Sequence, residues 1–82
     1  MTDQCMSDAS LWSPSRTGVW RRDNAQGREL ADALEKRMTE TNNPSLLGWT
    51  VKAIIDGGIY DGVEVGFCQR VAERAIYRAE VA

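Results

Sequence analysis

The most informative absences in this sequence are those of chemically reactive side chains. The chain of 82 residues contains no histidine and only two cysteines, Cys5 and Cys68. Without histidine, acid–base and triad mechanisms that depend on an imidazole are excluded. Two distant cysteines with no histidine also resemble neither a zinc site nor a disulfide framework. The sequence therefore predicts a protein that is not an enzyme and uses no metal or cofactor.

Long apolar runs and an excess of positive charge are also missing. No stretch approaches the roughly 20 apolar residues that span a bilayer, and no charged region followed by an apolar run begins the chain. We therefore expect a cytoplasmic protein with no membrane contact. Ten basic and 12 acidic residues give a net charge of −2, which argues against nucleic acid as a partner.

What the sequence does contain is helical periodicity, and the expected fold class is all-α. Residues 1–22 carry Ser, Thr, Asp, Gly and Pro without apolar periodicity, which predicts a flexible N-terminal arm. Residues 23–82 predict a three-helix domain, with helices over about 24–41, 44–56 and 62–79. Apolar side chains interrupt the arm, and such residues either fold back onto the domain or dock on a partner; they are Leu11, Trp12, Val19 and Trp20.

Local signals mark the ends of the expected helices. Asp23 or Asn24 suits the N-cap of the first helix. Pro44 suits the first position of the second helix, and a Gly57-Gly58 pair suits its end, with one glycine in the left-handed conformation. The third helix is expected to begin with a capping box, whose two members are Asp61 and Glu64.

The second expected helix is apolar nearly all round. Only Ser45, Lys52 and Asp56 form a polar strip on it. Such a helix must be covered on more than one side, so a homodimer is compatible with the pattern. Trp49, near the polar strip, either packs in the core or against the arm, or is a partly exposed anchor for a partner. The following Ile59 and Tyr60 are expected to close the end of the bundle, and the alternative is a contribution to an exposed apolar patch, which would indicate association.

The third expected helix carries two distinct faces. An alanine-rich stripe suits the core, and it consists of Val65, Cys68, Val71, Ala72, Ala75, Ile76 and Ala79. The other face is expected to point outward and carries Val63, Phe67, Arg70, Arg74, Tyr77 and Arg78. Arginine mixed with aromatic residues is favoured at protein interfaces, so these residues and Trp49 are the candidate partner-binding set. The alternatives are a solvated arginine ridge with Phe67 packing against the arm, and phosphate binding.

A helix-turn-helix formed by the second and third helices is the main competing interpretation. Arg70 and Arg74 would then lie on the recognition helix of a small DNA-binding regulator. The GGIYDG connection is longer than the usual turn of three or four residues, however. The third helix is also acidic at its start, where base contacts normally form, because it opens with Asp61 and Glu64.

Four segments carry a resemblance to a known family: GRELADALEKRM, NPSLLGW, GGIYDGVEVGF and QRVAERA. Over about residues 27–75 the chain resembles the QseM-like quorum-sensing antiactivators, small helical proteins encoded on bacterial mobile elements. The resemblance implies a non-enzymatic protein that captures a LuxR-type transcriptional activator and holds conjugative transfer off. It assigns no individual binding residue.

Overall fold

The computed structural model describes residues 12–81, with side chains described as far as Tyr77. This part of the chain forms three α-helices and no strand: α2 (Trp20–Thr41), α3 (Ser45–Gly57) and α4 (Gly62–Val81). The all-α, three-helix prediction is therefore confirmed, with bounds of α3 and α4 close to those expected. Residues 1–11, which include Leu11, lie outside the described residues. None of the described helices is long and apolar enough to cross a membrane.

The N-terminal arm differs most from its prediction. Residues 20–22 belong to α2, which begins four residues earlier than expected, and residues 12–19 pack against the domain. Asp23 is buried and does not cap the helix from outside. Instead its carboxylate accepts hydrogen bonds from the Thr17 N–H and hydroxyl, at 2.9 and 2.8 Å, and from the Gly18 N–H at 3.2 Å. These bonds fix the chain where it enters α2.

The backbones of α2 and α4 come close together at two glycines. A Cβ atom on Gly27 would lie 1.9 Å from the Val63 carbonyl oxygen, and one on Gly66 would lie 2.1 Å from the Asn24 carbonyl oxygen. Any side chain at either position would collide with the neighbouring backbone. The two glycines therefore bring the helices into direct backbone contact, and this crossing is the main helix–helix contact of the fold.

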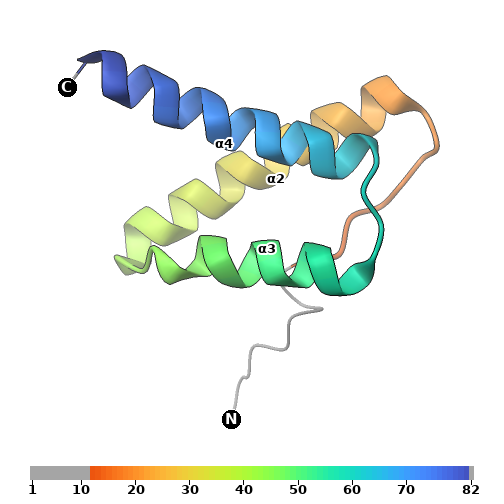
Figure 1. Ribbon diagram of the computed structural model, residues 1–82, viewed down its shortest axis with the longest axis horizontal. Coiled ribbons are helices and arrows are strands. Elements are labelled where there is room, and N and C mark those ends of the chain that lie inside the picture. The colour runs from red at the N-terminus through yellow and green to blue at the C-terminus, as the bar shows by residue number, and fades with distance from the viewer. Residues whose placement is uncertain (1–11, 82) are drawn as a thin grey trace, which may run out of the picture.

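The helix α3 packs more loosely on the other two. Asn42 ends α2 and Gly58 ends α3, and both adopt the left-handed conformation. A glycine in this conformation was expected at the end of α3. Figure 1 shows α3 and α4 diverging from their connection, with α2 crossing behind them. The radius of gyration is 13.2 Å, against about 12 Å for a compact domain of this length. The three helices thus leave one face of the molecule open.

The two faces of α4 are interchanged relative to the prediction. Val63 and Phe67, expected on the outer face, are buried against α2 with 0% and 1% of their surface exposed. Four residues of the expected core stripe are exposed instead: Cys68, Ala72, Ala75 and Ile76. Both faces carry apolar residues, and Gly66 decides between them because it lies on the Val63–Phe67 side and permits the closest contact with α2. Of the remaining members of the expected core stripe, Val65 and Val71 are half-buried, and the side chain of Ala79 lies outside the described ones.

Candidate protein-interaction surface

A buried carboxylate holds the N-terminal segment onto the start of α4. Glu64 is fully buried, and Asp61 N–H donates to it at 2.9 Å, which confirms the predicted capping box. Arg16 donates to both Glu64 oxygens and also pairs with Asp61 at 2.6 Å. Trp12 Nε1 donates to Glu64 at 2.9 Å. Burial alone would raise the pKa of Glu64, but these hydrogen bonds outweigh it and lower the pKa from 4.5 to about 2.

The ring of Trp12 covers Phe67. Their ring centroids are 5.0 Å apart and the planes meet at 74°, an edge-to-face contact that aromatic pairs prefer. Phe67 therefore packs against the arm, as in the alternative interpretation of this face, and is not available to a partner. We call residues 12–19 the N-terminal strap. The Trp12 contact matches the fold-back alternative for the apolar residues of the arm. The Arg16–Glu64 contact had no signal in the sequence, because the two residues are 48 positions apart in the chain.

Two members of the predicted arginine ridge, Arg70 and Arg74, remain partly exposed but pair with carboxylates of the protein. Arg74 pairs with Asp32 at 3.1 Å and with Glu35 at 3.3 Å. Arg70 pairs with Asp32 at 3.3 Å and with Glu73 at 3.2 Å. These arginines therefore lie within an ion-pair network that joins α4 to α2, so their charge is already balanced inside the molecule.

The remaining predicted site residues are spread over separate surfaces. Tyr77 is 62% exposed on α4, and Trp49 is 52% exposed on α3. Arg78 lies in α4, but its side chain lies outside the described ones. The predicted set thus does not form one surface: Val63 and Phe67 are core residues, and Arg70 and Arg74 are ion-paired.

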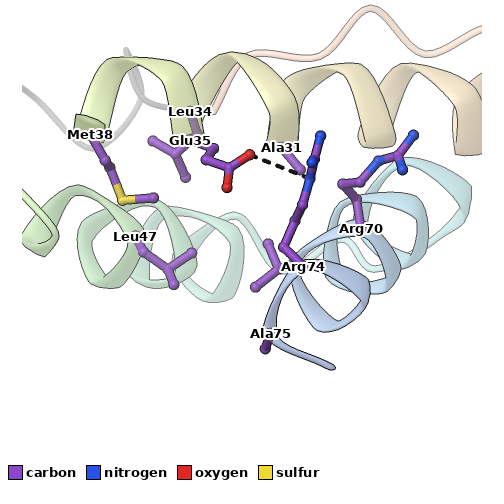
Figure 2. Close-up of a pocket in the computed structure, with 9 residues that line it drawn as sticks. Ala31, Leu34, Glu35, Met38, Leu47, Arg70, Arg74 and Ala75 are labelled. Atoms are coloured by element: carbon purple, nitrogen blue, oxygen red, sulfur yellow. Dashed lines mark ion pairs between the residues drawn. The ribbon is translucent and has the colours of Figure 1, made fainter. Parts of the chain in front are cut away.

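A groove runs between α3 and α4, and α2 forms its floor at the open end, where α3 and α4 are furthest apart (Figure 1). One hollow of about 210 Å³ lies at this open end (Figure 2). Its lining is apolar apart from three charged residues, and consists of Ala31, Leu34, Glu35, Met38, Leu47, Arg70, Val71, Arg74 and Ala75. A second hollow of about 340 Å³ lies at the end formed by the α3–α4 connection, and its lining is Val51, Ile54, Ile55, Gly58, Ile59, Tyr60 and Cys68. The two adjoin, since Leu47 and Val51 are four residues apart on α3, and Cys68 and Val71 are three apart on α4.

The connection end of the groove is the most apolar exposed surface that the structure describes. Ile55, Ile59 and Tyr60 are 70%, 50% and 64% exposed, and no charged residue lines this hollow. Both Ile59 and Tyr60 are largely exposed, so they match the alternative of an exposed apolar patch better than closure of the bundle end. A hydrogen bond with the Cys68 side chain raises the pKa of Tyr60. Cys68 itself is exposed rather than a core residue.

Trp49 lies on the other flank of α3. Helical spacing places it about 160° around the axis from Val51 and about 120° from Ile55, and it is not among the residues that line either hollow. Trp49 is thus partly exposed, which agrees with the second of its two predicted roles, that of an exposed anchor, and not with packing in the core. Comparison of the chain with family models, curated proteins and solved structures gave no match.

Proposed function

We propose that this chain is a non-enzymatic regulatory protein that binds another protein through the connection end of the groove. The observation that carries this proposal is the exposure of Ile55, Ile59 and Tyr60 around a hollow without charged residues. Contiguous exposed apolar patches mark association sites because leaving them in water is unfavourable. An aromatic beside aliphatic side chains, at the rim of a hollow, is also the composition of interface hot spots.

The finer part of the proposal concerns the partner. The resemblance of residues 27–75 to QseM-like antiactivators supports a LuxR-type transcriptional activator. Binding would sequester the activator and so repress conjugative transfer. A binding surface on a domain of this size is consistent with such a role, because sequestration needs affinity and no chemistry.

The competing DNA-binding interpretation loses the residues on which it depended. Arg70 and Arg74 would have to release Asp32, Glu35 and Glu73 before they could contact phosphates. Each such exchange replaces an existing ion pair, so little attraction for a phosphate backbone is gained. No observation in the described residues favours a second function over protein binding.

The test is an affinity capture from the native host after nuclease treatment, using the full chain as bait. We expect a transcriptional activator to be recovered with the wild-type chain and lost with Tyr60→Ala and Ile55→Ala. Trp49→Ala is the matched control, because Trp49 is an exposed aromatic on the opposite flank of the same helix. We expect Trp49→Ala to retain the activator.

Two outcomes would overturn the proposal in different ways. Loss of the activator with Trp49→Ala but not with Tyr60→Ala would place the interface on the other flank of α3. Recovery of no activator, together with retention of duplex DNA when nuclease is omitted, would replace protein binding by DNA binding. Circular dichroism of each variant confirms that these exposed substitutions leave the helices intact.

A further inference from the structure

The N-terminal strap lies on the domain as an extended chain with alternate side chains turned inward. Trp12, Pro14 and Arg16 are half-buried, and the residues between them are exposed. This period of two is typical of an extended peptide that lies on a surface. The inward side chains line a hollow of about 440 Å³, whose opposite wall is formed by α3 and by Ile59. Figure 1 shows the strap running from the start of α2 past the α3–α4 connection. The strap therefore occupies a cleft formed by the three helices, as a bound peptide would.

The domain holds the main chain of the strap as well as its side chains. The Gln26 side chain accepts a hydrogen bond from the Ser15 N–H at 2.8 Å and donates one to the Ser15 carbonyl at 2.7 Å. The Asp23 carboxylate accepts hydrogen bonds from the N–H groups of Thr17 and Gly18. Such main-chain groups are common to all residues except proline, which lacks the N–H. These contacts therefore suit an extended chain of many different sequences.

Two side chains of the strap make the sequence-specific contacts. Arg16 donates to both oxygens of Glu64, in the two-pronged geometry that distinguishes arginine from lysine. Trp12 donates its indole N–H to the same carboxylate, and its ring packs on Phe67. Because Glu64 is fully buried, an occupant without a cation would leave this carboxylate unpaired and away from water. The cleft therefore favours a chain that carries an aromatic residue and, four positions later, an arginine.

The strap can leave this cleft without unfolding a helix. Residues 12–19 precede α2 and belong to none of the three helices that the structure describes. The backbone crossing of α2 and α4 at Gly27 and Gly66 involves no residue of the strap. The hollow between the strap and α3 also shows that the strap does not fill its own cleft. The strap covers Phe67 while it is in place, and its departure would make the whole cleft accessible.

From these features we infer that the cleft is a peptide-binding site. The strap occupies it in the free chain, and the cleft accepts in its place a segment of a partner protein with an aromatic residue followed four positions later by arginine. Such a segment would make the contacts that the strap now makes with Gln26, Glu64 and Phe67. The site differs from the connection end of the groove, because Ile55 and Tyr60 do not line the hollow beside the strap. The inference therefore does not rest on the proposed function, and either can fail without the other.

The test measures binding of a fluorescent synthetic peptide with the strap sequence WSPSRTGV, residues 12–19, to the full-length chain. The double variant Trp12→Ala/Arg16→Ala lacks the side chains that anchor its own strap. We expect the peptide to bind this variant about tenfold or more tighter than the wild type, whose strap competes at the high effective concentration of a tethered segment. A peptide with lysine in place of the arginine should bind about tenfold or more weaker, because lysine does not form the two-pronged contact. Fluorescence anisotropy gives each dissociation constant.

Two further variants make the result specific to the cleft. Ser15→Pro removes the N–H whose hydrogen bond Gln26 accepts and leaves the Arg16–Glu64 contact in place, so it loosens the strap without leaving a buried charge unpaired. We expect this variant also to bind the peptide more tightly than the wild type. Tyr60→Ala, added to the double variant, is the matched control because Tyr60 lies at the connection end. It should leave the peptide affinity unchanged, although the proposed function requires it to lose the activator.

Several results would overturn the inference. A double variant that is folded by circular dichroism but does not bind the peptide at about 1 mM contradicts it directly. Equal affinity of the wild type, the double variant and Ser15→Pro would place the peptide elsewhere on the molecule. A double variant that is unfolded, and gains no helix when the peptide is added, would show that the strap belongs to the framework of the fold and is not an exchangeable occupant. Equal binding of the lysine peptide would contradict the required arginine.

Discussion

The two sides of α4 differ sharply in how they are used, although both are apolar in sequence. The side toward α2 carries Val63 and Phe67, which are fully buried, and its flanking charges are all paired. The side toward the groove carries Cys68, Ala75 and Ile76, which are exposed. The first side holds the fold together, and the second leaves apolar residues exposed. Apolar composition alone therefore does not distinguish a core face from an exposed face on a helix that has so few neighbouring helices.

The largest expected effect contrasts one residue from each side of α4. Phe67→Ala removes a buried ring that packs against Trp12 and Ile54, so we expect a loss of about 3 to 5 kcal/mol in the free energy of unfolding. Ile76→Ala removes an exposed side chain and should change it by less than about 0.5 kcal/mol. Urea unfolding gives both values. Equal effects would contradict the assignment of the two sides.

The second effect is a pH dependence that belongs to the buried side. The ordinary pKa of a glutamate side chain is 4.5, and the fold lowers the pKa of Glu64 to about 2. Because the folded value is the lower one, the carboxylate stabilises the fold fully above pH 4.5, and this contribution is lost as the pH falls toward 2. The difference corresponds to at most about 3 kcal/mol.

The measurement is chemical unfolding at several pH values between 7 and 2. We expect Glu64→Gln to be less stable than the wild type at pH 7 and to lose less further stability on acidification. Glu29→Gln, at an exposed position on α2, is the matched control and should follow the wild type. The hydrogen bonds from Thr17 also lower the pKa of Asp23, so some acid dependence should remain in the Glu64 variant. Identical pH profiles for Glu64→Gln and wild type would rule out this role.

The smallest expected effects contrast two helical glycines. A methyl group on Gly66 would meet the backbone of α2, so Gly66→Ala should destabilise the fold by about 1 to 3 kcal/mol. Gly48, within α3, has no atom within 4 Å of the corresponding position. Gly48→Ala should therefore stabilise the fold by about 0.5 to 1 kcal/mol through helix propensity. Thermal unfolding by circular dichroism measures both, and opposite signs are the expected result.

Local signals in the sequence predicted the helices better than the contacts between them. Gly57 and Gly58 ended α3, and the Asp61–Glu64 spacing identified the capping box, because these devices act within a few residues. The same reasoning placed the start of α2 at Asp23 or Asn24, which is wrong. Asp23 lies within the helix, and its carboxylate accepts hydrogen bonds from the N–H groups of Thr17 and Gly18. Such an arrangement has no fixed spacing in the sequence.

The candidate site was predicted less well, for a physical reason. The sequence identified α3 and α4 as carrying too much apolar surface for three helices, and the groove between them has that character. It could not specify which residues would line the groove. Ile55 and Tyr60, now central to the proposed interface, were not in the predicted binding set. Arg70 and Arg74 were in that set because their charge partners on α2 are about 40 residues away in the chain.

The sequence by itself determined the all-α class, the number of described helices, the bounds of α3 and α4, and the absence of histidine-based chemistry. These depend on composition, periodicity and short-range capping, which are encoded locally. Only the tertiary structure decided which side of α4 meets α2, and with it which apolar residues remain exposed. That choice was made by Gly27 and Gly66, whose missing side chains let two backbones touch, and by the strap that Arg16 and Glu64 hold over Phe67.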